Sequence, residues 1–397
     1  MNVVLSIDAI HPPLAGIGRY TWELATRLPL HPEVETIRFL SDGLWRELPK
    51  IELDNEPSAD AVSAARPAEV KLNYKGRVRQ FLGRLTPISR LYAQLVPLIA
   101  SRQLNTVKNG IFHGTNFFVP KTKLPSLVTI HDLSIYRYPQ WHPQARIERM
   151  RMTIPESVQR ANLVLTDSQA TKIEVMQEFN LSNEQVCAVP LGVDGIFHPR
   201  SELEIAPILA QYGLQPGGYS FFVSTIEPRK NLINLLAAYR LLPIALRSAW
   251  PLVLVGGGGW KSDDIHVEIE RATREGWLKY LGFIDQRLLP VFYAGCRLFT
   301  YPSWYEGFGL PIAEAMASGV PVLTSNCSSM PEVAGGAAML VEPGDVSSIY
   351  QGLTQALDDD NWRVQAIHRG LQRASELTWD ACVQKTLQAY QLVQKSI

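Results

Sequence analysis

The chain has 397 residues, of which 46% are hydrophobic and 19% are charged, and its 38 Lys and Arg residues balance its 38 Asp and Glu residues. A chain of this length and composition is typical of a soluble protein with two domains. Its four cysteines lie far apart in the sequence and form no CxxC pair, which argues against a zinc site.

The N-terminus begins with MNVVLSIDAI, which runs directly into a strand-like segment. We expect no secretory signal, because no basic segment precedes an apolar core there. No stretch of about 18 uncharged apolar residues occurs, so we also expect no membrane-spanning helix. These patterns predict a cytoplasmic protein.

Strand-like and helical segments alternate along the first half of the chain. A Gly-containing loop at 13–20 and a helix at 21–28 follow the first strand. The predicted strands are 2–8, 35–40, 110–115, 126–132, 161–168 and 185–192. Such alternation is typical of a mostly parallel sheet with helices on both faces.

One segment of this first half has an unusual charge. Residues 70–131 contain no Asp or Glu, but they contain ten Lys and Arg residues. Within 71–102 the basic residues alternate with Leu, Tyr, Phe and Val, as in amphipathic segments that rest on anionic lipid. A solvated helical face fits the pattern equally well. Nucleic acid fits less well, because nothing else in the chain resembles a nucleic-acid module.

A second series of strands begins after a segment rich in Pro and Gly, at 189–218. These predicted strands are 219–225, 251–259, 278–284, 297–303, 321–326 and 337–343. We therefore expect an α/β protein with two doubly wound domains, 1–195 and 196–375, and a C-terminal helix, 376–397, that packs back on the first domain. Ligands bind at the carboxyl ends of the strands in such sheets, so we expect a site in the cleft between the domains.

The segment EGFGLPIAEAMASGVPVLTSN, at 306–326, combines a Gly-rich turn with a predicted helix that begins near Pro311. Unpaired N–H groups and the positive end of the helix dipole make such a turn a cradle for phosphate. Glu306 precedes the turn, and we expect Glu314 in the first helical turn. Both carboxylates could reach a ligand held there. The spacing alone fits equally well with Glu314 as a favourable charge near a helix start.

This segment, together with SSMPEVAGGAAMLVEPGD after it, resembles the E-x7-E region of the retaining GT-B glycosyltransferases of glycosyltransferase family 4. The family includes bacterial mannosyl- and rhamnosyltransferases of surface polysaccharide assembly. Further segments of the family occur in the same order over essentially the whole chain: GIGRY at 16–20, FHGTNFFVP at 112–120, TIHDLS at 129–134, VPLGVD at 189–194, STIEPRKN at 224–231 and YLGFID at 280–285. The resemblance implies two Rossmann-like domains that face a central cleft.

The resemblance also implies roles for individual residues. Glu314 would bind the ribose hydroxyls of a nucleoside diphosphate sugar, and Glu306 would bind hydroxyls of the transferred sugar. The remaining donor contacts would come from Gly16 near the diphosphate, from Ile284 at the base, and from the amides of Phe308, Gly309 and Leu310 at the sugar and diphosphate. His131 would contact the donor sugar near the reacting carbon, although a lone His at a strand end is as often structural. We expect His113 to be structural.

Arg229 and Lys230 follow a predicted strand directly. A diphosphate gains charge as it leaves, so fixed cations aimed at it stabilise the transition state. The alternative, that Arg229 and Lys230 are two solvated residues at a helix start, is disfavoured because cations there oppose the helix dipole. Many relatives carry a further Arg where this chain has Ser224 and Thr225, so Arg229 would substitute for it in part. We assign catalytic roles to Lys230, His131 and Glu306.

We expect no metal site and no cofactor besides the donor substrate. Asp358, Asp359 and Asp360 contain a D-x-D pattern, but they follow a helix and are typical of a cap or a solvated turn.

The predicted function is the transfer of mannose or rhamnose from a nucleoside diphosphate sugar, with GDP as the favoured nucleotide. The acceptor would be a glycan or lipid-linked glycan in polysaccharide or lipopolysaccharide biosynthesis, with a peripheral contact to the inner face of the plasma membrane as an option. Two alternatives are a sucrose- or trehalose-type synthase with a soluble acceptor and a non-catalytic scaffold subunit of the same fold.

Overall fold

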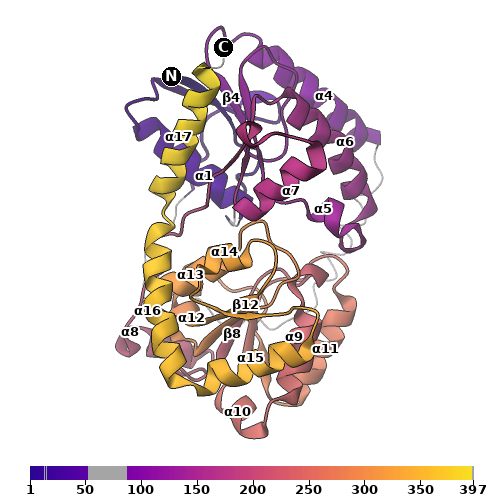
Figure 1. The fold of residues 1–397 in the computed structure, drawn as a ribbon. Coiled ribbons are helices and arrows are strands. Elements are labelled where there is room, and N and C mark those ends of the chain that lie inside the picture. The colour runs from indigo at the N-terminus through magenta and orange to yellow at the C-terminus, as the bar shows by residue number, and fades with distance from the viewer. Residues whose placement is uncertain (13, 15, 52–86, 396–397) are drawn as a thin grey trace.

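The structure is a computed structural model that describes residues 1–12, 14, 16–51 and 87–395. The chain forms two α/β lobes, each built on its own sheet (Figure 1). The first lobe holds β1 to β7 and the second holds β8 to β13. The prediction of two doubly wound halves is confirmed.

The first sheet has the order β3-β2-β1-β4-β5-β6-β7. Its strands are β1 (Asn2–Ser6), β2 (Thr36–Ser41), β3 (Leu44–Arg46), β4 (Ile111–Gly114), β5 (Ser126–Ile130), β6 (Leu163–Thr166) and β7 (Val186–Ala188). All neighbours pair in parallel except β2 and β3. Helices cover both faces, and β4, β5 and β6 are therefore buried along their whole length.

The edge strand β3 was not predicted. Asp42 and Gly43 both have positive φ, 52° and 76°, and they form a tight turn that brings β3 back antiparallel to β2. Asp-Gly is a preferred pair for such hairpin turns.

The helices of the first lobe are α1 (Ile17–Arg27), α4 (Pro87–Leu104), α5 (Ser134–Arg137), α6 (Gln144–Arg160) and α7 (Gln169–Phe179). Residues 71–86 of the basic stretch predicted at 71–102 lie outside the described residues, and residues 87–102 belong to α4. No helix in the described part of the chain combines the length and the apolar character that crossing a membrane requires.

The second sheet has the order β10-β9-β8-β11-β12-β13 and is parallel throughout. Its strands are β8 (Ser220–Val223), β9 (Leu252–Val255), β10 (Leu278–Tyr280), β11 (Leu298–Tyr301), β12 (Val322–Ser325) and β13 (Met339–Val341). Its helices are α8 (Glu202–Gln211), α9 (Leu232–Leu241), α10 (Ile244–Ala249), α11 (Asp263–Arg274), α12 (Leu289–Gly295), α13 (Leu310–Ala317), α14 (Met330–Ala334), α15 (Val346–Asp358) and α16 (Asp360–Glu376).

The C-terminal helix α17 (Trp379–Lys395) leaves the second lobe and lies along the first, beside α1 (Figure 1). The Tyr390 hydroxyl lies 2.8 Å from Nδ1 of His113, and Asp380 pairs with Arg27 at 2.5 Å. Burial lowers the pKa of His113 to about 3, so this His is a neutral structural residue, as predicted. We propose a first domain of residues 1–195 together with α17, and a second domain of residues 196–375.

The three consecutive Asp residues of the D-x-D pattern lie at the junction of α15 and α16. Asp359 caps α16 by accepting a hydrogen bond of 2.9 Å from the Trp362 amide, and Asp360 pairs with Arg297. The prediction of a cap is confirmed.

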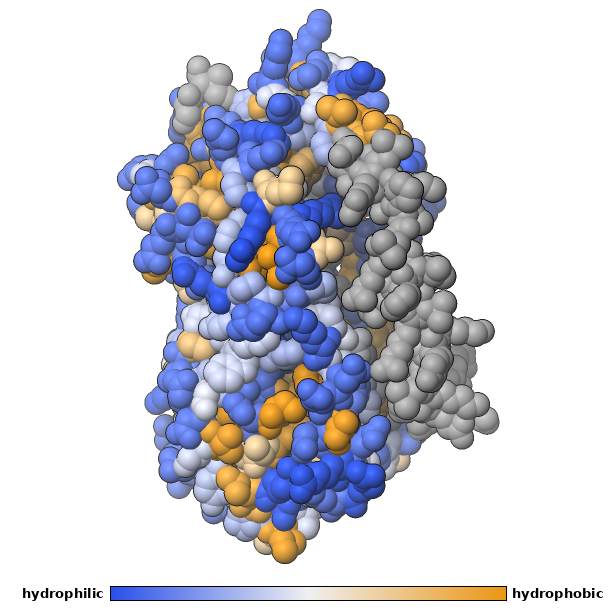
Figure 2. Space-filling model, turned by 90° about the vertical axis from the view of Figure 1, so that its right-hand side faces the viewer, coloured by the Kyte–Doolittle hydropathy of each residue, from blue (hydrophilic) through white to orange (hydrophobic). Residues whose placement is uncertain are grey.

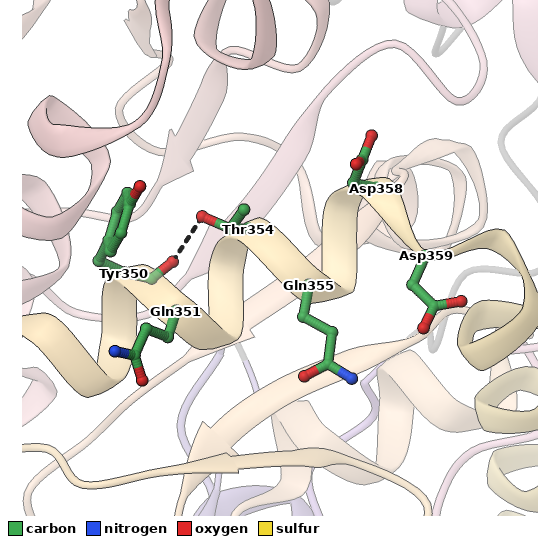
Figure 3. A pocket seen from close by; sticks show the side chains of 6 residues that line it. All are labelled: Tyr350, Gln351, Thr354, Gln355, Asp358 and Asp359. Carbon is green, nitrogen blue, oxygen red and sulfur yellow. Dashed lines mark hydrogen bonds between the residues drawn. The ribbon is translucent and has the colours of Figure 1, made fainter.

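A shallow surface depression lies on α15 (Figure 3). It is lined by Tyr350, Gln351, Thr354, Gln355, Asp358 and Asp359. Figure 1 shows α15 on a part of the second lobe that is turned away from the first, so this depression lies apart from the junction of the lobes. On the face shown in Figure 2, hydrophobic groups are interspersed with hydrophilic ones in both lobes.

Candidate functional site

The two lobes meet at Gly307, in the loop between β11 and α13. Its carbonyl accepts hydrogen bonds from the hydroxyls of Ser168, at 2.7 Å, and Thr171, at 3.1 Å, at the start of α7. A Cβ added to Gly307 would lie 1.8 Å from the carbonyl oxygen of His131. The backbones of the two lobes therefore approach each other more closely than any residue other than glycine allows.

Replacing Gly307 with alanine is expected to hold the lobes apart and to lower transfer activity by about 100-fold, because misplacement of the reacting groups by about 1 Å has an effect of that size. Small-angle scattering should show a larger radius of gyration. Gly195→Ala is the matched control, because Gly195 is exposed and an added Cβ there would meet nothing within 4 Å. A Gly307→Ala variant with the activity and the radius of gyration of the wild type would show that the close approach of the lobes is not needed for activity.

Further contacts join the lobes close to Gly307. The Glu332 carboxylate of α14 accepts hydrogen bonds from the amides of Gln169, at 2.9 Å, and Ala170, at 3.1 Å, at the N-terminus of α7. This contact places a negative charge at the positive end of a helix dipole. The Tyr305 hydroxyl accepts from the Leu133 amide at 3.0 Å and donates to Glu174.

A cluster of opposite charges lies beside this junction. Lys230 donates from Nζ to Oε1 of Glu306, at 2.7 Å, and to the hydroxyl of Tyr301, also at 2.7 Å. Arg229 donates from Nη1 to Oε2 of Glu306, at 3.0 Å, and from Nε and Nη2 to Glu227. The structure thus brings together three residues that the sequence analysis singled out, Arg229, Lys230 and Glu306.

Burial and charge act against each other on the pKa values of this cluster. Burial alone would raise the pKa of Glu306, but Arg229 and Lys230 outweigh it and hold that pKa below its usual value. Burial, together with the neighbouring Arg229, lowers the pKa of Lys230. An ammonium group has three N–H donors, and the third donor of Lys230 has no partner among the described residues.

His131 directly follows β5, and its ring points into the first lobe. Its Nδ1 lies 2.8 Å from Oδ2 of Asp167, and its Nε2 lies 2.8 Å from the carbonyl oxygen of Thr115. A carbonyl only accepts, so Nε2 carries a hydrogen. Burial alone would lower the pKa of His131, but the nearby Asp167 outweighs burial and raises this pKa above its usual value. The ring contact with a donor sugar stays a prediction, and a hydrogen bond from a ring nitrogen to that sugar would require one of these two bonds to break.

The Gly-rich turn leads into α13, with Gly309 as the residue before the helix at a φ of 108°. Pro311 occupies the second helical position, where no intrahelical N–H is needed. The amides of Phe308, Gly309 and Leu310 donate to no other described residue. These amides and the helix N-terminus are unpaired in the described part of the chain, as a phosphate cradle would require, and binding of a phosphate there stays a prediction.

Glu314 is the fifth residue of α13 and lies just beyond the first helical turn. The helix begins at Leu310 and has no acidic residue in its first turn, so the expected position of Glu314 in that turn is wrong. Its Oε2 accepts a hydrogen bond of 2.8 Å from the hydroxyl of Tyr293, and its Oε1 has no partner among the described residues. Burial raises the pKa of this half-buried carboxyl to about 7, although Tyr293 and Arg19 act to lower it.

The predicted base-binding and diphosphate-binding loops come from opposite lobes and contact each other. Ile284 is buried next to Gln286, whose side-chain amide donates to the carbonyl of Leu14 at 2.9 Å. Gly16, with a φ of 49°, precedes α1 in the same loop of the first lobe. Arg19, in the first turn of α1, pairs with Asp194 and lowers the pKa of Glu314 across the junction.

Sequence reasoning missed several residues of this site. Asp167, Tyr293, Tyr301 and Arg19 touch or face the residues that it singled out. Asp167 and Tyr301 directly follow or end strands of the two sheets, and the rule that ligands lie at carboxyl ends of strands could have found them. Among the described residues, no three His, Cys, Asp or Glu side chains are placed to hold a metal ion together.

Comparisons with known proteins find similar sequences among glycosyltransferases. The sequence profile described as "Glycosyl transferases group 1" matches residues 211–373. The chain is 38% identical over 393 residues to O-antigen chain mannosyltransferase B of Escherichia coli, covering 99% of this chain and 100% of that protein. It is 26% identical to an MMP alpha-(1->4)-mannosyltransferase of Mycolicibacterium hassiacum, covering 87% of this chain and 85% of the relative.

Solved structures show the same fold at low sequence identity. HepE of Anabaena, solved with UDP and glucose, superposes with a TM-score of 0.68 at 17% identity and covers 98% of both chains. Sucrose-phosphate synthase of Thermosynechococcus elongatus gives a TM-score of 0.68 at 19% identity over 100% of both chains. At these identities the likeness concerns the fold alone.

Proposed function

Because the chain belongs to the group 1 glycosyl transferases, we propose that it transfers mannose from GDP-mannose to a growing glycan, with retention of the anomeric configuration. The chain is a glycosyltransferase with the GT-B fold and a nucleotide-sugar donor. The choice of mannose is supported by the full-length relative, which is named an O-antigen chain mannosyltransferase. The observation that carries the proposal is the buried cluster of Arg229, Lys230 and Glu306 beside the free amides of α13.

In the proposed reaction, the bond between the anomeric carbon and the diphosphate oxygen breaks, and a bond to an acceptor hydroxyl oxygen forms on the same face of the sugar. The hydroxyl proton passes to the departing diphosphate, and in this mechanism no enzymic carboxylate acts as a covalent nucleophile. The amides of Phe308, Gly309 and Leu310 would hold the diphosphate. The free N–H of Lys230 would donate to its developing charge, while Glu306 binds hydroxyls of the transferred sugar.

We propose that Arg229 and Lys230 stabilise the diphosphate without a metal ion. Both cations are held by buried carboxylates, so they are already oriented before the donor binds. Activity that persists in EDTA is the expected result. A wild-type enzyme that EDTA silences and manganese restores would contradict this mechanism.

A donor screen tests the proposed function. The purified enzyme is incubated with GDP-, UDP-, ADP- and dTDP-sugars and a mannose-containing acceptor, and release of the nucleotide is measured. GDP-mannose should be the best donor, with GDP- and dTDP-rhamnose as the informative competitors. Transfer from UDP- or ADP-glucose to glucose 6-phosphate or fructose 6-phosphate would favour a synthase of the sucrose or trehalose type. No turnover with any donor would favour a scaffold.

We also propose that the basic segment 71–102 brings the enzyme to anionic lipid that carries the acceptor. Each Lys or Arg near such a surface contributes about 1 kcal/mol, and salt screens the attraction within a Debye length. The combined replacement of Arg77, Arg79 and Arg84 by Gln should release the protein from anionic vesicles in a sedimentation assay, while GDP affinity stays unchanged. If the wild type and the triple variant are recovered equally in the supernatant at low salt, the proposed binding to anionic lipid is wrong.

A further inference from the structure

Aromatic side chains of both lobes meet on one side of the charged cluster. We call this group the aromatic rim. It consists of Tyr138, Trp141 and His142 from the first lobe and Trp260 and Trp304 from the second. Its Tyr and Trp side chains are all half-buried, so the rim belongs to the core of neither lobe.

The rim is continuous with the proposed donor site. Trp304 lies two residues before Glu306, and its amide donates to the carbonyl of Arg229 at 2.9 Å. Its ring centroid is 6.2 Å from that of Trp141, which stacks on Tyr138 at 4.3 Å. Trp304 therefore links the aromatic rim to the charged cluster.

His142 is the unusual member of the rim. It is only 4% exposed, yet neither of its ring nitrogens has a hydrogen-bond partner among the residues that the structure describes. Burial and the nearby Arg146 lower its pKa to about 4, so the ring is neutral at physiological pH. A neutral imidazole offers one donor and one acceptor, the same pair that a sugar hydroxyl can satisfy.

A merely structural seam between the lobes explains this arrangement poorly. Burying an unpaired polar group is unfavourable, and most buried polar side chains in proteins are hydrogen-bonded. A nonpolar side chain of similar size would close the seam without that penalty. The ring of His142 lies 6.0 Å from Trp260 of the other lobe, so any separation of the lobes uncovers both rings together.

We propose that the aromatic rim binds the terminal sugar of the acceptor glycan, with His142 hydrogen-bonded to one of its hydroxyls and Trp260 packed against its C–H face. This inference rests on the proposed function, since it assigns a place to the acceptor of that reaction. The negative face of an aromatic ring attracts the weakly positive C–H groups of a hexose. The place fits because it adjoins the cluster at which the anomeric carbon would react.

The proposal commits to a neutral hexose as the occupant. Among the cationic side chains near the rim, the guanidinium of Arg146 already lies over the Trp260 ring at 5.2 Å, and Lys261 donates to the carbonyl of Gln140. The pyranose ring of mannose has both a hydrophobic face and the hydroxyls that this combination recognises.

The test measures acceptor and donor parameters separately in His142→Ala and Trp260→Ala. The acceptor is a synthetic α-mannose disaccharide with an octyl aglycone. We expect the acceptor KM to rise about fivefold in His142→Ala and about tenfold in Trp260→Ala. GDP affinity by calorimetry and the slow hydrolysis of GDP-mannose should stay unchanged. His142→Gln should recover part of the loss, because Gln also offers a donor and an acceptor.

Matched controls are Trp45→Ala and His368→Ala. Trp45 is a half-buried Trp on β3 that lies under Arg38, and His368 is an exposed His on α16. The proposal is overturned if the folded His142 and Trp260 variants have the acceptor KM of the wild type. It is also overturned if the acceptor KM rises as much in the control variants.

Failure of the proposed function gives a different result. If the wild type transfers nothing to the disaccharide, binding of the same disaccharide is followed by tryptophan fluorescence. A signal that disappears in His142→Ala supports the rim as a sugar site in spite of that failure. A wild type that shows no saturable signal overturns the rim as well.

Discussion

Replacement of Lys230 by methionine should lower kcat by about 100-fold or more and change the donor KM far less. Methionine keeps much of the length of the side chain but removes its charge and all three N–H donors. The charge of Lys230 matters most when the diphosphate leaves, because negative charge on the diphosphate is then greatest. Single-turnover measurement of GDP-mannose consumption isolates this step from product release.

The result needs a check that the site remains folded. Arg229 still pairs with Glu306 in the variant, so the carboxylate is not left without a cation. GDP affinity should therefore remain within a few-fold of the wild type. Lys385→Met is the control, because Lys385 is exposed on α17, far from the cluster in sequence and in the fold. Full turnover by the Lys230 variant would refute the proposed cationic mechanism.

The second large effect is expected at Glu314. Its replacement by alanine should weaken binding of free GDP by roughly 10- to 100-fold, the equivalent of about 1.5–3 kcal/mol for hydrogen bonds to a charged group. The ribose contact is made with or without the sugar, so calorimetry with the nucleotide alone measures it. Tyr293→Phe is a matched companion, because it removes the hydroxyl that now bonds Oε2 and leaves the carboxyl in place. Unchanged GDP affinity in a folded Glu314→Ala variant would refute the ribose assignment.

The raised pKa of Glu314 adds a pH dependence with a definite sign. Ribose hydroxyls donate to the ionised carboxylate, so GDP binding favours loss of the proton. With a pKa of about 7 in the free protein, GDP affinity should rise from pH 6 to pH 8 and then level off. Glu314→Gln keeps an acceptor but cannot ionise, and it should lose this part of the dependence. The titration of the GDP phosphates is common to both proteins and cancels in the comparison.

Local sequence patterns were sufficient to predict most of the fold. Every strand of the second sheet falls inside a predicted segment, because buried parallel strands are short apolar runs bounded by Gly and Pro. Strand β3 was missed because its three residues, Leu44–Arg46, do not form an apolar run. Its signal was the Asp42-Gly43 turn, which is a feature of backbone conformation and not of hydrophobicity.

The site was harder to predict because its contacts span the chain. The pairing of Lys230 with Glu306 could be placed in one cleft by the family resemblance, but its hydrogen bond to Tyr301 depends on the register of β11. The partner of His131, Asp167, directly follows the next strand of the sheet, β6, 36 residues later in the sequence. No periodicity in the sequence reports which ring nitrogen faces which acceptor, so the orientation of His131 into the first lobe required the structure.

The junction at Gly307 has a consequence for the balance between substrate entry and product release. The bonds from Ser168 and Thr171 to the Gly307 carbonyl, and those from α7 to Glu332, involve only protein groups. A donor that enters between separated lobes has an apparent affinity equal to its intrinsic affinity multiplied by the fraction of molecules that are open to receive it. Stronger contacts at this junction would retain GDP longer after each transfer, and weaker ones would admit water to the reacting sugar. Substitutions at the hydroxyl and amide groups that begin α7 are therefore expected to change the balance between donor entry and GDP release.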